Sequence, residues 1–308
     1  MDKITAKLPQ PYYRTEYGAA YLGDALGLMR SVPDATINLI MTSPPFALNK
    51  KKAYGNVDSS KYVEWFKPFA KEFWRVLRED GSLVIHMGGS WDKGCPTRSM
   101  YHFELLFDLC RPKQDDSRFY FAQDFYWFNT AKLPAPAEWV TVRRMRVKDA
   151  VDPIWWLSKC PFPKANNRRV LSPYSEAMHR LLEQGYNAGL RPSGHNISQK
   201  FQTDNGGAIP SNLLAIANTE SNGGYLKSCR TSKIKPHPAR YPVALPEFFI
   251  KFLTEEGDLV LDPFGGSNAT GQAAENTGRL WVCFEQEEEY LKGSVFRFNS
   301  RTNGLPHD

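Results

Sequence analysis

The sequence predicts an α/β fold built on a mostly parallel sheet. Three observations support this: helical and strand patterns alternate from Tyr21 to Gly89, two aromatic-rich strand patterns follow, and the alternation returns from Pro246 to Glu285. Alternating helices and strands are typical of parallel sheets. At 308 residues the chain is long enough for one large α/β domain with an insertion, or for two modest domains.

The individual elements follow from hydrophobic spacing. Apolar residues recur at helical spacing from Val63 to Leu77, and Glu79-Asp80-Gly81 is expected to end that helix. The remaining helices are predicted at residues 25–30, 246–254 and 268–276. Strands are predicted at residues 37–41, 82–87, 119–129, 151–157, 258–262 and 279–285, and a hairpin fits the third and fourth of these best.

Between about Cys160 and Pro236 the periodicity fades, which predicts a loop-dominated insertion. From Lys164 to Lys235 there are ten Lys or Arg residues and four Asp or Glu residues. This excess equals the net charge of +6 of the whole chain. A basic region of this kind permits a polyanionic partner.

Composition excludes several other classes. The five cysteines lie far apart without a CxxC pair, so we expect neither a zinc site nor a disulfide framework. This cysteine usage fits a protein of the reducing cytoplasm. Residues 1–10 contain no apolar signal core, and no run of about eighteen apolar residues is present. We expect a soluble protein that binds neither a membrane nor a metal.

A glycine-rich turn follows an apolar strand at Asp262-Pro263-Phe264-Gly265-Gly266-Ser267. Adjacent glycines let a ligand approach the backbone. Glu285 ends the next strand, at the offset where an acid binds ribose hydroxyls in dinucleotide folds. Asp262 would repel phosphate but attract the cationic groups of S-adenosylmethionine, so an adenosine ligand without pyrophosphate fits best. The alternative is a structural turn with an exposed glutamate.

A second loop, Thr42-Ser43-Pro44-Pro45-Phe46, also follows a strand. Its prolines fix φ and remove N–H donors, which leaves the Ser43 hydroxyl and carbonyl oxygens as acceptors. Two hydrogen bonds from a base amino group to these acceptors would favour a pyramidal nitrogen, and Phe46 would stack on a base taken out of the duplex. The alternative is a simple helix-starting turn.

Together, Thr42–Phe46 and Asp262–Ser267 resemble the motifs of the β-class amino-methyltransferases, in which the catalytic motif precedes the cofactor motif. Resemblance to a DNA cytosine-N4 member of this family extends from about Tyr21 to Phe298. It includes residues 47–56, 125–129, 146–151, 205–210 and 237–240.

The resemblance implies the S-adenosylmethionine-dependent methyltransferase fold: a twisted, mostly parallel sheet with a terminal hairpin, helices on both faces and an irregular target-recognition insertion. The catalytic half would span residues 1–159, the insertion 160–236 and the cofactor-binding half 237–308. S-adenosylmethionine would contact Asp24, Asp262, Phe264, Gly265, Gly266, Ser267, Glu285 and Pro238. Asp24 is equally suited to cap the helix at residue 25. His237 is expected to pack and fix its loop, not to carry protons.

The catalytic residues implied are Ser43, Pro44, Pro45 and Phe46. Within the family, Ser at position 43 marks cytosine-N4 over adenine-N6 transfer. Ser43 is a poor base, so we expect it to orient the amine while the proton leaves to water. No Pro-Cys nucleophile motif is present, which argues against cytosine-C5 chemistry.

The expected partner is double-stranded DNA, with a cognate restriction endonuclease as a functional partner and the bacterial nucleoid as location. Asn, Gln and Arg in the insertion suit base edges. Arg143, Arg144, Arg146 and Lys148 suit phosphates, as do Lys50–Lys52 unless they form a plain surface run. Adenine-N6 transfer, methylation of a protein glutamine and a non-enzymatic DNA-binding module are the competing hypotheses.

Overall fold

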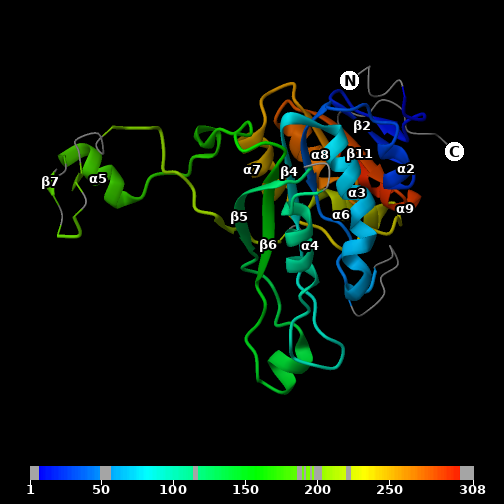
Figure 1. Ribbon diagram of the computed structural model, residues 1–308, viewed down its shortest axis with the longest axis horizontal. Coiled ribbons are helices and arrows are strands. Elements are labelled where there is room, and N and C mark those ends of the chain that lie inside the picture. Colours follow the sequence, from blue (N-terminus) through cyan, green and yellow to red (C-terminus); the bar gives the residue numbers. More distant parts are fainter. Residues whose placement is uncertain are drawn as a thin grey trace. The chain divides into compact units, whose positions relative to one another are not determined.

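The computed structural model describes residues 7–48, 57–113, 117–185, 189–190, 192–194, 196–197, 203–219 and 223–298 (Figure 1). The lysine run Lys50–Lys52 lies outside these residues. The chain divides into two compact units, one formed by residues 1–165 with 212–308 and the other by residues 166–211. The first unit contains the large sheet and both hydrophobic clusters.

Nine strands form the sheet of the first unit, in the order β1-β2-β11-β10-β3-β4-β6-β5-β9. Their bounds are β1 Tyr13–Arg14, β2 Gly18–Leu22, β3 Ile37–Thr42, β4 Leu77–His86, β5 Tyr120–Phe128, β6 Val151–Ser158, β9 Leu213–Ala215, β10 Leu259–Asp262 and β11 Leu280–Glu285. The five central strands β2, β11, β10, β3 and β4 are parallel. The predicted parallel sheet is therefore confirmed.

The antiparallel part of the sheet lies beside β4. Strand β6 pairs antiparallel with both β4 and β5, so β5 and β6 form the expected hairpin. Residues 129–150 connect these two strands and extend beyond the lower end of α4 in Figure 1. This connection contains one π-helical turn, Glu138–Val142. We call residues 129–150 the β5–β6 connection.

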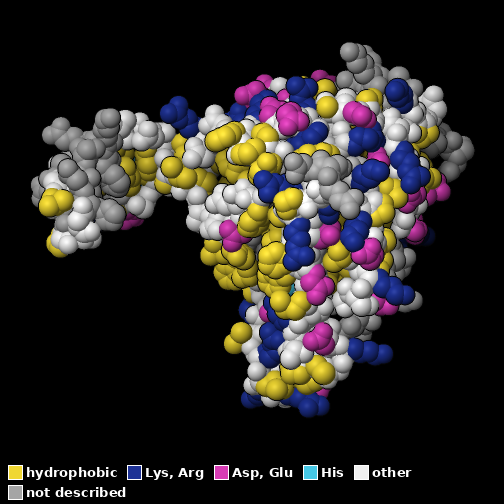
Figure 2. Space-filling view, in the orientation of Figure 1, with side chains coloured by type: hydrophobic (Ala, Val, Ile, Leu, Met, Phe, Trp, Pro, Cys, Tyr) yellow, Lys and Arg dark blue, Asp and Glu magenta, His cyan; other side chains and the backbone are white. Residues whose placement is uncertain are grey.

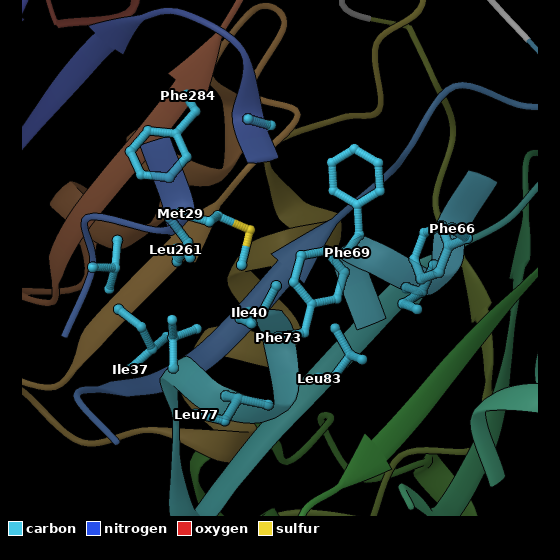
Figure 3. Close-up of a cluster of buried hydrophobic side chains, with 14 of the residues drawn as sticks. Met29, Ile37, Ile40, Phe66, Phe69, Phe73, Leu77, Leu83, Leu261 and Phe284 are labelled. Carbon is cyan, nitrogen blue, oxygen red and sulfur yellow. The ribbon is translucent and has the colours of Figure 1, made fainter. Parts of the chain in front are cut away.

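Helices cover both faces of the sheet. On one face α2 (Ala25–Met29), α3 (Tyr62–Val76) and α4 (Tyr101–Cys110) bury a cluster that includes Phe66, Phe73 and Phe284 (Figure 3). On the other face α7 (Ala244–Leu253), α8 (Ala269–Asn276) and α9 (Glu288–Ser294) bury a second cluster around Phe249 and Trp281. A further helix, α6 (Gly224–Thr231), contacts α9 and the 3-10 turn Val295–Phe298.

Helix α3 ends earlier than its sequence predicts. Glu79-Asp80-Gly81 was expected to stop it, but the helix ends at Val76 and β4 begins at Leu77. The side chain of Leu77 is fully buried, and the residue pairs with Ile37 of β3. Burial of Leu77 at the sheet therefore ends the helix before the turn residues are reached.

The second unit, residues 166–211, is shorter than the predicted insertion of residues 160–236. Its described elements are a 3-10 turn at Asn167–Val170, α5 (Glu176–Gln184) and the short strands β7 (Gly189–Leu190) and β8 (Asn196–Ile197). Ser175 caps α5, and Ser172 pairs with Ala208. Residues 212–236 belong to the first unit, where β9 joins the large sheet.

Among the described helices, none has the length and apolar character needed to cross a bilayer.

Candidate functional site

A cavity of about 650 Å³ opens at the carboxyl ends of the parallel strands. This is the edge where open α/β sheets bind their ligands. Its wall is formed by residues that follow β2, β3, β10 and β11, by His86 at the end of β4, and by the segment before α7. The lining includes Asp24, Ser43, Pro44, Pro45, Phe46, Pro238, Phe264, Gly265, Gly266, Ser267 and Glu285. All of the predicted site residues except Asp262 line this cavity.

The loop after β3 is held in place by hydrogen bonds at both ends. Thr42 Oγ1 donates to Asp262 Oδ1 at 2.8 Å, and the Tyr62 hydroxyl donates to the Pro45 carbonyl at 2.8 Å. The Phe46 carbonyl accepts from the Leu48 N–H. The Pro45 and Phe46 carbonyls are therefore used inside the protein. Ser43 and Pro44, which carry two of the acceptors predicted for this loop, both line the cavity.

Phe46 stands against the next strand end. Its ring lies edge-on to that of His86, with ring centroids 5.4 Å apart. A Cβ atom at Gly88 would come within 2.3 Å of the Phe46 ring, so only glycine fits there without moving the ring. The loop after β4 therefore determines where Phe46 stands in the cavity.

The glycine-rich turn after β10 is packed closely against its neighbours. A Cβ at Gly265 would lie 1.9 Å from Cys283 Sγ, and Gly266 adopts a φ of +53°. The Gly266 N–H donates to Glu285 Oε2 at 2.8 Å. Phe264 packs on Phe69, with ring centroids 5.2 Å apart, and both rings line the cavity.

Asp262 does not reach the cavity. It is buried, and its carboxylate accepts hydrogen bonds from Thr42, Tyr241, Thr270 and the Phe264 N–H. Burial raises the pKa of Asp262, against the effect of these donors. In the structure Asp262 ties the turn to the loop after β3, and its predicted contact with the cationic groups of a ligand stays a prediction.

Two other predicted acids, Asp24 and Glu285, do line the cavity. Glu285 is buried at the end of β11, and its Oε1 accepts from the Glu287 N–H at 2.9 Å. Burial raises the pKa of Glu285 above its usual value of 4.5. Asp24 caps α2 by accepting from the Gly27 N–H at 2.7 Å and also lines the cavity, so both expectations for Asp24 are compatible with the structure.

The segment before α7 closes the opposite side. The His237 N–H donates to the Tyr225 hydroxyl, and its ring packs on Tyr290 with centroids 4.5 Å apart. Burial, together with nearby Arg240, lowers the pKa of His237 to about 4, although the Ala239 carbonyl opposes this shift. His237 is thus neutral near pH 7, which agrees with the predicted role in loop packing.

His86, Asp152 and Lys132 also line the cavity, and none was predicted as a site residue. Ser43 Oγ lies 3.0 Å from His86 Nδ1, and Asp152 Oδ2 lies 3.9 Å from His86 Nε2. Lys132 Nζ donates to both oxygens of Asp152 at 3.0 Å. The position of His86 at a strand end was the available signal in the sequence.

In the parts of the chain that the structure describes, no group of three or more His, Cys, Asp and Glu side chains is arranged to hold a metal ion.

Comparison with known proteins gives consistent matches. A DNA methylase family model matches residues 37–296. The Type II methyltransferase M.PvuII of Proteus hauseri is 52% identical over 292 residues, which cover 94% of this chain and 86% of that protein.

Solved structures match as well. The structure of the PvuII DNA methyltransferase (cytosine-N4-specific) has a TM-score of 0.75 and 46% identity, covering 94% of this chain and 89% of that chain. The M1.HpyAVI–SAM complex has a TM-score of 0.53 and 20% identity, covering 92% and 99%. The second match shows a shared fold alone.

Proposed function

This chain belongs to the DNA methylase family, and we propose that it transfers the methyl group of S-adenosylmethionine to the exocyclic N4 of cytosine in double-stranded DNA. The predicted methyltransferase fold is confirmed. One observation carries the proposal: the Ser43–Phe46 loop and the Phe264–Ser267 turn line the same cavity, tied together by the Thr42–Asp262 hydrogen bond.

The cavity fits S-adenosylmethionine. Glu285 offers carboxylate oxygens of the kind that bind ribose hydroxyls, while Phe264 and Phe69 form an aromatic wall suited to adenine. A Cβ at Gly266 would lie 3.2 Å from the His237 ring and would fill space between the turn and the opposite wall. When bound, this cosubstrate supplies a methyl group attached to a positively charged sulfur.

The protein's own part in the reaction is to orient the amine. Ser43 Oγ and the Pro44 carbonyl would accept the two N–H bonds of the cytosine amino group, which draws its lone pair out of conjugation with the ring. Phe46 would stack on the base, because every base presents a π-face. The base must leave the duplex to enter this cavity.

The β5–β6 connection is the surface that we assign to the DNA duplex. It starts at the cavity, since Asn129 and Lys132 line it. Its exposed side chains combine cations with large apolar groups, as the space-filling view also shows (Figure 2). They are Leu133, Val142, Arg143, Arg144, Met145, Val147 and Lys148.

Three of the four predicted phosphate contacts also have partners inside the protein. Arg143 pairs with Glu138 at 2.8 Å, and Lys148 Nζ donates to the Lys132 carbonyl at 3.1 Å. The Arg146 guanidinium lies 3.8 Å from the centre of the Trp91 ring and donates to the Pro96 carbonyl. Arg146 therefore holds the β5–β6 connection against residues 91–96, whereas Arg144 and Lys148 are exposed.

The remaining assignments rest on the relatives. We assign target recognition to residues 160–236, whose Asn, Gln and Arg side chains suit base edges. M.PvuII is a Type II methyltransferase, so a cognate restriction endonuclease is the proposed functional partner and the bacterial cytoplasm, at the nucleoid, the proposed location.

Analysis of the methylated product tests the function. DNA treated with the protein and S-adenosylmethionine should yield N4-methylcytosine when it is digested to nucleosides and weighed by mass spectrometry. Ser43→Ala should lower the rate of transfer at least about 100-fold, because an acceptor for the amine is lost, while cosubstrate binding stays within about threefold.

The competing hypotheses give different results. N6-methyladenine as the sole product would contradict the proposal. The 52% identity to M.PvuII does not favour adenine-N6 transfer. Full transfer by Ser43→Ala would show that the loop does not act on the amine.

A further inference from the structure

His86 is buried with one ring nitrogen bonded and the other without a hydrogen bond. Its Nδ1 lies 3.0 Å from Ser43 Oγ. Its Nε2 has no hydrogen-bond partner among the described residues, although Asp152 Oδ2 lies 3.9 Å away. The rings of Phe46, Trp127 and Tyr241 surround it edge-on, with centroids 5.4 to 6.0 Å away. The imidazole is therefore fixed in orientation, and its tautomer depends on its polar neighbours.

Asp152 presents a charged carboxylate to this ring. Its own burial would raise its pKa, but His86 and Lys132 outweigh burial and lower the pKa of Asp152 below the usual aspartate value. Lys132 contacts both carboxylate oxygens and holds the group in place. The groups that face His86 with charge or a titratable proton are Asp152, with Lys132 behind it, and Tyr241, whose hydroxyl is bonded to Thr270.

We propose that Asp152 and His86 form a proton relay behind Ser43. The negative carboxylate favours the tautomer with its proton on Nε2, so Nδ1 accepts the Ser43 hydroxyl proton. The Ser43 oxygen then directs its lone pairs to the base amine. Asp152 and His86 are positioning residues in this arrangement, because neither needs to touch the base. This inference rests on the proposed cytosine-N4 transfer.

The relay also gives the departing proton a destination. Once N4 has gained a methyl group it carries a positive charge and one proton too many. The N4–H bond breaks and its proton passes to Ser43 Oγ, while the original Oγ–H proton passes to His86 Nδ1. Base and serine end neutral. His86 is then an imidazolium that faces the Asp152 carboxylate. Its extra proton passes to solvent after the reaction.

Single-turnover rates of methyl transfer, measured from pH 5 to 9 with bound DNA, test this relay. The wild-type rate should fall in acid, since a protonated His86 cannot accept the serine proton. His86→Asn should lower the rate about 100-fold and remove this acid limb. Asp152→Asn should lower the rate at least about tenfold, because the negative carboxylate that favours the tautomer with its proton on Nε2 is lost.

Asp258→Asn is the matched control. The side chains of Asp258 and Asp152 are each 16% exposed, and Asp258 pairs with Lys164 at 2.7 Å, but it lies outside the cavity. Its rate and pH profile should equal those of the wild type. Cosubstrate binding within about threefold of wild type shows that each variant is folded.

Nitrogen NMR of histidine-labelled wild-type protein tests the tautomer without any substitution. Protonated Nε2 and bare Nδ1 in the resting protein are expected for His86. The opposite tautomer, or an acid limb that persists in His86→Asn, would overturn the relay. A wild-type protein that produces no N4-methylcytosine would instead contradict the proposed function, so the two failures are distinguishable.

Discussion

Glu285 places a buried carboxylate in the cavity wall, where its protonation state controls what it can bind. Burial raises the pKa of Glu285 above 4.5, so the carboxylate takes up a proton at a higher pH than an exposed glutamate does. A protonated acid accepts hydrogen bonds from ribose hydroxyls less well. The affinity for S-adenosylmethionine is therefore expected to be full above the raised pKa and to fall as pH decreases through it.

Calorimetric titration with S-adenosylmethionine between pH 4.5 and 8 checks this expectation. Glu285→Gln should bind about 10- to 100-fold more weakly at pH 7, since a hydrogen bond to a charged group contributes about 1.5–3 kcal/mol. Its affinity should also vary little with pH. Glu79→Gln, whose side chain is 81% exposed, is the control and should behave as wild type. A pH dependence that survives in Glu285→Gln would assign the titration to another group.

Individual site residues were predictable where the local sequence determines their role. Glu285 ends a predicted strand, Ser43 lies in the loop that follows another, and both line the cavity. Asp262 also ends a strand, yet its side chain turns into hydrogen bonds with Thr42 and Thr270. The direction of a side chain depends on partners from distant parts of the sequence, so spacing alone does not determine it. His86 was missed because its partner Asp152 lies 66 positions away.

At the level of elements, segments with a clear apolar or amphipathic pattern were predictable and segments without one were not. Helix α3 and strands β3, β10 and β11 appear where hydrophobic spacing places them. Strand β2 was not predicted, because its buried part includes Ala19 and Ala20, whose small side chains give little periodic signal. Helix α4 was also not predicted, and Phe103 and Phe107 on its exposed face obscure its amphipathic pattern.

Gly88, in the loop after β4, packs against the Phe46 ring in the loop after β3. This contact predicts the effect of adding one methyl group at Gly88. In Gly88→Ala, the new Cβ would collide with the Phe46 ring at 2.3 Å, and the ring must move away from the position where it would stack on the base. Because stacking contributes about 1–3 kcal/mol per base, the rate of methyl transfer should fall about 5- to 150-fold. Binding of S-adenosylmethionine should stay unchanged.

A double-mutant cycle with Phe46→Ala checks that the effect passes through this ring. Gly88→Ala should cost little further rate once Phe46 is already alanine. Gly224→Ala is the control, because a Cβ at Gly224 meets nothing within 4 Å. Additive losses from Gly88→Ala and Phe46→Ala would instead mean that Gly88 acts on another part of the site.

In the whole molecule, the hydrophobic core lies in one unit, and residues 166–211, assigned to target recognition, form the other. Both hydrophobic clusters lie in the unit formed by residues 1–165 and 212–308. Within the described residues of 166–211, none contributes a buried hydrophobic side chain to either cluster. A unit that adds nothing to the core should be dispensable for folding. The predicted insertion, residues 160–236, also contains β9 and α6, which belong to the first unit.

Replacing residues 166–211 with a glycine-serine segment of the same length tests this separation. The variant should keep its affinity for S-adenosylmethionine within about threefold and its melting temperature within a few degrees, since the cavity and both clusters are retained. Its preference for one DNA sequence should be lost, as measured by competition between specific and random duplexes. A variant that loses cosubstrate binding would show that residues 166–211 stabilise the catalytic unit. A variant that keeps its DNA sequence preference would place target recognition in the β5–β6 connection or in residues 212–236.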